Sequence, residues 1–182
     1  MLDRLDKDQY YSPRVLIAKF FEQGADKRPI YDGWILEPCN GEGAISDTLA
    51  NYGHHHLTCT DIDNGLQYDA SDPSYWWIHD RHDWVFTNPP YRLAADILRL
   101  ALENTSKGVT MLLRLSFLEP CKSRRDMLTA GLSHITIVNP RPKFRSDSKG
   151  SDSSTVAFIT WTHGYQGNPN VNYLVDWHLT SH

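Results

Sequence analysis

The run Asp83–Tyr91, which reads Asp-Trp-Val-Phe-Thr-Asn-Pro-Pro-Tyr, places the tightest constraint on how this chain can fold. Its apolar residues Trp84, Val85 and Phe86 have the character of a buried strand in an α/β sheet. The two prolines end that strand, because each has a fixed φ and neither has an N–H for the ladder. We therefore expect Asn88 at the carboxyl end of a strand, which is the edge where open α/β sheets bind ligands.

The end of this run gathers groups that suit a planar amine. Asn88 offers a carboxamide oxygen, and the proline that follows keeps its backbone extended. The Pro89 carbonyl is a second acceptor beside it, and Tyr91 adds an aromatic surface. Two acceptors and a stacking ring suit a planar group that carries an NH2. A plain Asn-Pro-Pro turn with its tyrosine packed on the core would explain the same residues, so other parts of the chain must distinguish the two.

A second motif follows another apolar run and reads Glu37-Pro38-Cys39-Asn40-Gly41-Glu42-Gly43. We expect a strand that ends at Glu37, a turn in which Gly41 and Gly43 permit positive φ, and a helix over about residues 44–52. The N-terminal N–H groups of that helix would face the same crevice. The third glycine of the dinucleotide fingerprint is missing. The carboxylate of Glu37 also disfavours a pyrophosphate, whereas it tolerates a cationic ligand.

Thr87–Tyr91 and the glycine motif resemble motifs IV and I of the amino-methyltransferases, which methylate exocyclic or amide nitrogens with S-adenosylmethionine. Gln9–Pro13 precedes both, and this order is similar to that of the γ-type enzymes and their phage relatives. The resemblance covers roughly residues 8 to 161. It implies that the catalytic residues are Asn88, Pro89, Pro90 and Tyr91, with Asn88 also beside the cofactor. It further implies that S-adenosylmethionine is bound by Tyr11, Ser12, Pro13, Glu37, Pro38, Gly41 and Gly43.

Ser12 and Pro13 also have a purely structural interpretation. Serine is a favoured helix N-cap, and proline is favoured at the first helical position. An apolar pattern at Val15, Leu16 and Phe20 follows, so we expect a helix that begins here. The two interpretations are compatible.

Two acidic residues follow the glycine motif at suitable intervals. Asp61 ends a predicted second strand about twenty residues after the glycine turn, where a carboxylate can accept both hydroxyls of a ribose. The resemblance implies that Asp61 binds the ribose, that Ile62 packs on the adenine ring and that Asp69 receives the adenine amino group. Asp63 is a close alternative to Asp61, and a solvated loop carboxylate is the alternative for each acid.

Strands and helices are expected to alternate along the chain, as in a doubly wound sheet. After the Asn-Pro-Pro-Tyr loop we expect a helix over 93–101, strands over 109–115, 134–138 and 155–161, and a short helix over 123–130. The family implies an α/β, Rossmann-like class I methyltransferase fold with a mostly parallel seven-stranded sheet and a C-terminal β-hairpin. We expect one domain over residues 1–162 and a tail over 163–182, without a separate target-recognition domain and hence with little sequence specificity.

Basic residues are unevenly distributed along the chain. The net charge is −4, yet Lys107–Lys149 holds nine of the eighteen Lys and Arg residues. A loop rich in Pro, Ser and Gly within this segment resembles part of small phage-type DNA adenine methyltransferases. Its expected substrate-binding residues are Arg141, Lys143, Phe144 and Arg145. Basic side chains around an aromatic suit contacts with nucleic-acid phosphates, whereas a solvated surface loop is the alternative.

The motifs together predict an enzyme that methylates the N6 amino group of adenine in DNA. RNA adenine methylation, glutamine N5-methylation of a protein, and a non-catalytic module that binds DNA or another partner are the alternatives. Methylation of cytosine carbon 5 is not expected, because Asn88 stands where that reaction needs a cysteine. No metal is expected, since His54, His55 and His56 are consecutive and would point in alternate directions.

Length and cysteine content suit an intracellular protein. The 182 residues match the size of one domain, and no apolar run is long enough to cross a bilayer. Three cysteines without paired spacing favour a reducing compartment. We therefore expect a cytoplasmic protein, which for a phage-encoded enzyme means the cytoplasm of the host.

Overall fold

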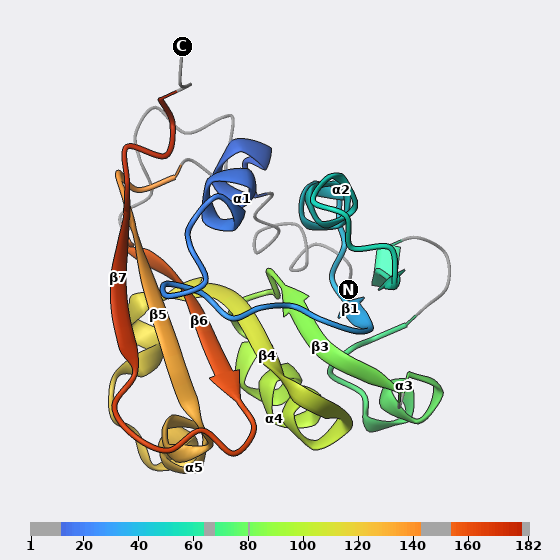
Figure 1. Ribbon diagram of the computed structural model, residues 1–182. Coiled ribbons are helices and arrows are strands. Elements are labelled where there is room, and N and C mark those ends of the chain that lie inside the picture. The colour runs from blue at the N-terminus through green and yellow to red at the C-terminus, as the bar shows by residue number, and fades with distance from the viewer. Residues whose placement is uncertain (1–11, 64–67, 80, 143–153, 180–182) are drawn as a thin grey trace.

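The computed structural model describes residues 12–63, 68–79, 81–142 and 154–179. Its strands are β1 Ile35–Glu37, β2 Leu57–Cys59, β3 His82–Thr87, β4 Thr105–Arg114, β5 Leu132–Asn139, β6 Val156–Thr162 and β7 Asn170–Val175. Its α-helices are α1 Arg14–Phe21, α2 Ala44–Asn51, α3 Pro73–Ile78, α4 Ala94–Asn104 and α5 Arg125–Thr129, with 3₁₀ turns at Leu115–Leu118 and Lys122–Arg124. The helices lie on both faces of one central sheet (Figure 1).

All seven strands belong to this sheet, in the order β2-β1-β3-β4-β6-β5-β7. Strand β6 runs antiparallel to its neighbours β4 and β5, and the other neighbouring pairs are parallel. The carboxyl ends of the six parallel strands therefore share one edge. This arrangement confirms the predicted α/β class, the mostly parallel sheet of seven strands and the hairpin formed by β5 and β6.

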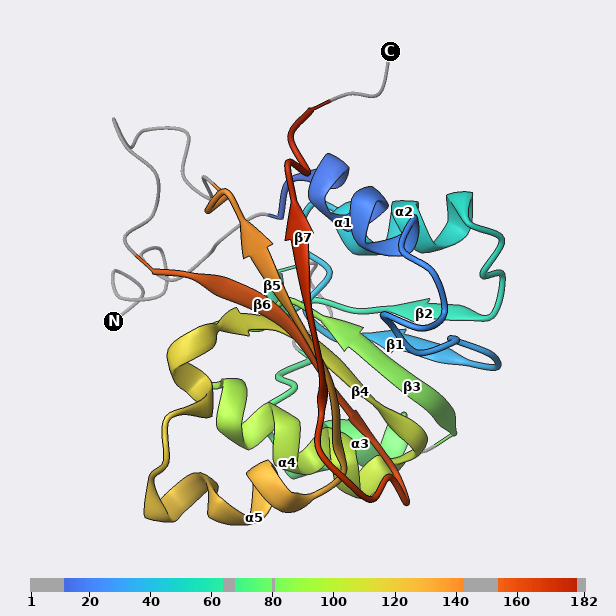
Figure 2. The ribbon, with the colours of Figure 1, turned by 60° about the vertical axis from the view of Figure 1, so that its left-hand side comes forward.

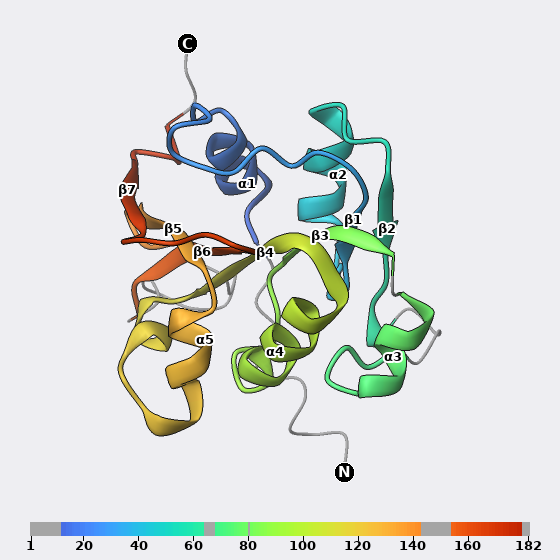
Figure 3. The ribbon, with the colours of Figure 1, turned by 60° about the horizontal axis from the view of Figure 1, so that its bottom comes forward.

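Helices α1 and α2 cover one face of the sheet, and α3, α4 and α5 cover the other (Figure 3). The core under α1 is aromatic: the ring of Phe20 stacks on that of Phe158 with 4.1 Å between centroids and meets Phe86 edge-on at 5.7 Å. On the opposite face, the buried indole of Trp161 donates a hydrogen bond to the Met127 carbonyl of α5. Within the described ranges, no helix has the length and apolar character needed to cross a membrane.

The position of β3 inside the sheet explains why its sequence is continuously apolar rather than alternating. Its last four residues, Trp84, Val85, Phe86 and Thr87, are all buried, because helices cover the sheet on both faces. The strand ends where the prolines begin, as predicted. Helix α4 then starts at Ala94 and packs Ala94, Ile97, Leu98, Leu100 and Ala101 into the core.

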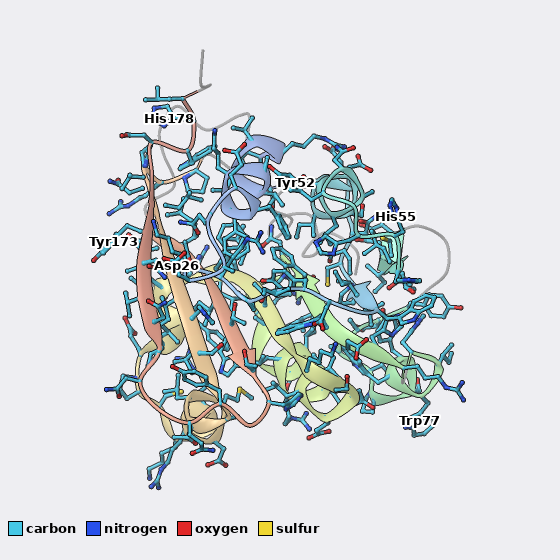
Figure 4. All side chains as sticks on the ribbon, in the orientation of Figure 1. Asp26, Tyr52, His55, Trp77, Tyr173 and His178 are labelled. Carbon is cyan, nitrogen blue, oxygen red and sulfur yellow. The ribbon has the colours of Figure 1, made fainter. Side chains whose placement is uncertain are left out.

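Helix α3 has no counterpart in the sequence prediction, although its start carries a local signal. The Asp72 side chain accepts a hydrogen bond from the Ser74 N–H, and Pro73 occupies the first helical position. The helix is only six residues long, and of its aromatic residues Trp76 is buried whereas Trp77 is 77% exposed and points outward (Figure 4). Such a short and half-exposed helix has too little periodicity to be recognised.

Strand β7 comes from the segment that was expected to be a tail. It pairs in parallel with β5 at the outer edge of the sheet, from His134 opposite Asn170 to Asn139 opposite Val175 (Figure 2). Only Leu174 among its apolar residues is buried, and Tyr173 points outward from the edge (Figure 4). The sheet therefore extends past residue 162.

Candidate active site

The carboxyl edge of the sheet brings together the polar residues that the sequence singles out. Glu37 is the last residue of β1, Asp61 lies two positions after β2, and Asn88 directly follows β3. Strand β1 lies between β2 and β3, so these three positions are adjacent along the edge. The strand order reverses between β1 and β3, and open α/β sheets bind their ligands at such a switch point.

The glycine turn is held against the end of β2. Gly41 and Gly43 have φ values of 49° and 78°, the left-handed region that disfavours a side chain. The Gly41 N–H donates to Asp61 Oδ2 at 2.7 Å, and the Asn40 N–H donates to the Thr60 carbonyl at 3.0 Å. These bonds fix the turn between β1 and α2, as predicted from its glycines.

Glu37 is a fully buried acid between Asp61 and Asn88 on this edge. Its Oε1 accepts hydrogen bonds from the Cys39 N–H at 2.9 Å and from Thr87 Oγ1 at 2.6 Å, which links the ends of β1 and β3. Burial outweighs these bonds and raises the pKa of Glu37 to about 8. Among the described residues, neither Glu37 Oε2 nor the buried Asn40 Oδ1 has a hydrogen-bond partner. Two buried acceptors without donors are suited to a ligand that donates hydrogen bonds.

Asp61, rather than Asp63, faces the glycine turn. Asp61 accepts the Gly41 N–H on one carboxylate oxygen and the Asp63 N–H on the other, at 2.7 and 2.9 Å. Its orientation is therefore fixed by backbone donors. Ile62, the next residue, is 48% exposed and presents an apolar surface beside this carboxylate.

Asp69 is held in a local turn on the other side of a short gap in the described chain. Its Oδ1 accepts both the N–H and the hydroxyl of Ser71, at 2.8 and 2.6 Å. The neighbouring ring of Tyr68 meets Tyr75 edge-on at 6.0 Å, and the Tyr75 hydroxyl bonds Thr60 Oγ1 at the end of β2. These contacts tie the Asp69 turn to Thr60, the residue before Asp61.

Asn88 contacts a residue 76 positions earlier in the chain. Its amide nitrogen donates to Ser12 Oγ at 3.0 Å, which joins the loop after β3 to the segment before α1. The expectation that Ser12 caps α1 with Pro13 as first helical residue is wrong. Helix α1 starts at Arg14, Pro13 is the capping residue, and no side chain bonds the first turn. The Ser12 hydroxyl bonds the loop after β3 instead.

Two arginines that the sequence analysis did not single out support these loops. Arg14 donates to the Glu42 carbonyl at 3.0 Å and pairs with Asp47, so that α1 holds the glycine turn and the start of α2. The Arg114 guanidinium lies over the ring of the half-buried Tyr91, 4.6 Å from its centroid. For the contact between Arg114 and Tyr91, the sequence offers one sign, which is that an arginine ends the apolar strand β4.

The remaining predicted residues fall into three groups. Pro38 and Pro89 are buried and Pro90 is half-buried at the edge, where the Pro90 carbonyl accepts the Leu93 N–H at the start of α4. Arg141 is exposed two residues after β5. Tyr11, Lys143, Phe144 and Arg145 lie outside the described residues.

Charge is polarised along this edge. The carboxylates of Asp61 and Asp63 follow β2, and the buried Glu37, whose raised pKa keeps it protonated at neutral pH in the free protein, ends β1. Arg114 and Arg141 stand at the ends of β4 and β5. Strand β3, which Asn88 directly follows, lies between the acidic ends of β1 and β2 and the basic ends of β4 and β5. In the part of the chain that the structure covers, no group of three or more His, Cys, Asp and Glu side chains is placed to hold a metal ion.

The sequence matches no protein-family model and no curated protein. Solved structures share its fold. A predicted O-methyltransferase from Agrobacterium tumefaciens aligns at 15% identity and a TM-score of 0.55, over 90% of this chain and 86% of that one. The methyltransferase subunit of a type I restriction-modification system from Streptococcus thermophilus aligns at 13% identity and 0.58, over 91% and 47%. A provisionally assigned RNA methyltransferase from Pyrococcus horikoshii aligns at 16% identity and 0.57, over 86% and 87%.

The chain thus has the Rossmann-like fold of these methyltransferases, which confirms the fold expected from its motifs. It spans most of the first and third of these proteins but less than half of the restriction-modification subunit, 47% of whose length it covers.

Proposed function

We propose that this chain transfers a methyl group from S-adenosylmethionine to the N6 amino group of adenine in DNA. The placement of Asn88 carries the proposal. Its side chain is anchored by Ser12 at the switch point of the sheet, one strand away from Glu37 and the glycine turn. A carboxamide in this place suits a reaction in which an amino group is held beside a bound nucleotide-like cofactor.

The residues around β1 and β2 fit S-adenosylmethionine, which carries a cationic ammonium group, a ribose and an adenine. The buried acceptors Glu37 Oε2 and Asn40 Oδ1 would receive the ammonium. Asp61 would accept the ribose hydroxyls, exposed Ile62 would cover the adenine ring, and Asp69 would accept the adenine amino group. The bound cofactor would supply an electrophilic methyl group on a sulfonium.

The chain's own contribution to the reaction is to orient the amino nitrogen of the target. The lone pair of that nitrogen is delocalised into the ring, so the nitrogen is a weak nucleophile. Asn88 Oδ1 and the Pro89 carbonyl would each accept a hydrogen bond from one N–H of this amino group. These two bonds would favour a pyramidal nitrogen whose lone pair points away from the ring plane. Acceptors fixed in advance lower the barrier by orientation and electrostatics. Tyr91 would stack on the base once it leaves the duplex.

The polarised edge favours nucleic acid as the substrate. The acidic half over β1 and β2 suits a cationic cofactor, and the basic half with Arg114 and Arg141 suits phosphates. DNA is our first choice because a restriction-modification methyltransferase subunit shares the fold. RNA is the second candidate, since a provisionally assigned RNA methyltransferase aligns with 86% of the length of this chain.

Parallel transfer assays with methyl-tritiated S-adenosylmethionine distinguish these candidates. Duplex DNA, single-stranded DNA, RNA and a protein extract are incubated with the same preparation. The proposal expects label in DNA. Label confined to RNA would show that RNA rather than DNA is the substrate, and label confined to protein would favour glutamine methylation.

Asp61→Ala is expected to weaken the binding of S-adenosylhomocysteine by roughly ten- to a hundredfold, because a charge-assisted hydrogen bond contributes about 1.5–3 kcal/mol. Isothermal calorimetry measures this change. Asp63→Ala is the matched control, since the substitution keeps the Asp63 N–H that donates to Asp61. Equal weakening by both variants, or by neither, would remove Asp61 from the ribose site.

Neutralising Arg141, Lys143 and Arg145 together is expected to weaken DNA binding while cofactor affinity stays unchanged. We propose from the sequence that these side chains contact phosphates. Each lost contact should flatten the slope of log affinity against log salt by about 0.9 on duplex DNA, or about 0.7 on single strands. Fluorescence anisotropy at several salt concentrations gives the slope, and a wild-type slope in the triple variant would exclude this loop from the interface.

A further inference from the structure

Strand β7 leaves one edge of the sheet open. Its inner side pairs with β5 in a continuous register, and among the described residues no strand pairs with its outer side (Figures 1 and 3). Proteins usually protect such an edge with lysine, proline or a bulge, because its unpaired backbone groups bind further strands. The six residues Asn170–Val175 include no charged residue and no proline, so this edge lacks the usual protection.

One hydrogen bond sets the direction of the backbone groups of β7. The Asp176 N–H donates to the Asn139 carbonyl of β5 at 2.9 Å. Because a trans peptide group points its N–H and its C=O in opposite directions, the Val175 carbonyl faces away from β5. Successive residues of a strand alternate in this respect. The N–H and C=O groups of Val171, Tyr173 and Val175 therefore face the open edge.

The side chains of the same three residues form an uncovered apolar row. Val171, Tyr173 and Val175 are 51%, 62% and 56% exposed, and Tyr173 points outward from the sheet (Figure 4). They lie on the face that α4 and α5 cover, since their neighbours in β5 include Ile135 and Ile137, which pack with the core on that face. Unpaired backbone groups and exposed apolar side chains thus coincide at one edge.

We propose that a second copy of this chain binds this edge, with the two β7 strands paired antiparallel about a two-fold axis at Tyr173. In this register Tyr173 lies opposite its own counterpart, and Val171 lies opposite Val175 of the second copy. These are the hydrogen-bonded positions of an antiparallel ladder, so each outward N–H meets an outward carbonyl. Each exposed apolar side chain also meets another apolar side chain. The inference is independent of the proposed methyl transfer.

Charge and symmetry favour a second copy over an unrelated strand. Pairing about a two-fold axis places a segment against itself, so a strand with charges of one sign would meet like charges. Residues 164–175 include no Lys, Arg, Asp or Glu. The next residue, Asp176, would lie opposite Asn170, so the two acids do not meet. Strand β7 therefore meets the conditions for pairing with itself.

The dimer is expected to be weak and to leave both candidate active sites accessible. Strand β7 supplies six residues, whereas a standard interface uses about 20–30 residues on each side. We therefore expect a dissociation constant of about 1–100 µM, which is typical of a small interface. Antiparallel pairing points the carboxyl edges of the two sheets in opposite directions, so neither copy covers the site of the other.

Sedimentation equilibrium of the wild type and of Tyr173→Lys tests the inference. The mean mass of the wild type should rise from one chain toward two between about 1 and 200 µM. Tyr173→Lys places two ammonium groups opposite each other at the axis and should raise the dissociation constant at least about tenfold. Trp77→Lys is the matched control, because Trp77 is 77% exposed on α3, beside the other half of the sheet, and it should dimerise like the wild type.

A mixture of two variants tests the register. Tyr173→Glu alone should also stay monomeric, because two carboxylates would meet at the axis. An equimolar mixture of Tyr173→Lys and Tyr173→Glu should dimerise, since opposite charges then face each other. This recovery requires that residue 173 of one copy lie beside residue 173 of the other. Thermal unfolding of each variant confirms that the compared proteins are folded.

Three results would overturn the inference. A wild type that keeps the mass of one chain at about 200 µM would exclude the dimer and leave a strand of another protein as the occupant of this edge. A dimer that forms equally well in Tyr173→Lys would place the interface elsewhere. A mixture of folded Tyr173→Lys and Tyr173→Glu that does not associate would contradict the two-fold register at Tyr173.

Discussion

Replacing Asn88 by alanine is expected to lower methyl transfer by about 10²–10³-fold, the loss typical of removing one preorganised hydrogen-bonding group that acts on the reacting atoms. The Asn88 oxygen would accept from the reacting amino group, so its loss removes an interaction that the cofactor does not replace. Affinity for S-adenosylhomocysteine should change little, because Glu37, Asp61 and the glycine turn stay in place. Single-turnover transfer and calorimetry on the same protein measure the two effects.

Asn172→Ala is a matched control for Asn88→Ala. It removes the same amide from β7, which three strands separate from β3 in the sheet. Its side chain donates to the Lys27 carbonyl, so a modest loss of stability is expected without loss of transfer. Near-normal transfer by Asn88→Ala on every nucleic-acid and protein substrate would contradict the proposed chemistry.

Glu37→Gln is expected to make the ligand-free protein more stable at pH 8 and to weaken cofactor binding. The pKa of Glu37 is raised from 4.5 to about 8 by burial, so the folded protein retains a proton that the unfolded chain releases. The resulting contribution to stability is fully present below pH 4.5 and is lost as the pH rises through about 8. Glutamine has nearly the same shape and no charge, and its oxygen can still accept from Thr87 and from the Cys39 N–H.

Chemical denaturation across the pH range measures this effect. Between about pH 5 and pH 8 the wild type should lose stability relative to Glu37→Gln, reaching a difference on the order of a few kcal/mol at the upper end. Glu42→Gln, in the exposed part of the same turn, is the charge-matched control and should follow the wild type. A Glu37→Gln curve parallel to that of the wild type would contradict the assignment of the effect to this carboxyl.

Ligand binding gives a second measurement of the same residue. At about pH 6.5 the Glu37 carboxyl is protonated in the free protein, and a bound ammonium group would favour its ionised form. Binding of S-adenosylhomocysteine should therefore release close to one proton in the wild type and none in Glu37→Gln. Calorimetry in two buffers with different ionisation enthalpies detects this release. Equal proton release by both proteins would place the ammonium elsewhere.

The sequence predicted the elements whose residues carry a strong local pattern. The buried run from Trp84 to Thr87 gave β3, the two prolines gave its end, and Gly41 with Gly43 gave the turn before α2. Parallel strands place their carboxyl ends at one edge, so the proximity of Glu37, Asp61 and Asn88 followed from topology alone.

Contacts between distant residues could not be predicted in this way. The Ser12–Asn88 bond joins residues 76 positions apart, and the same serine matched a helix cap equally well by local pattern. Arg114 reads only as a polar end to an apolar strand, because its contact with Tyr91 depends on the relative extension of β3 and β4. Strand β7 was missed although Val171 and Tyr173 alternate with Asn170 and Asn172, because this short pattern directly follows the Gly, Asn and Pro residues of 164–169, which are typical of a loop.

Identification of the methylated product tests the proposed function most directly. DNA is incubated with S-adenosylmethionine and either the wild type or Asn88→Ala, digested to nucleosides and analysed by mass spectrometry. We predict N6-methyldeoxyadenosine with the wild type and at most traces with Asn88→Ala. Absence of any methylated nucleoside from DNA with the wild type, or equal amounts of product from the two proteins, would contradict adenine methylation by this site.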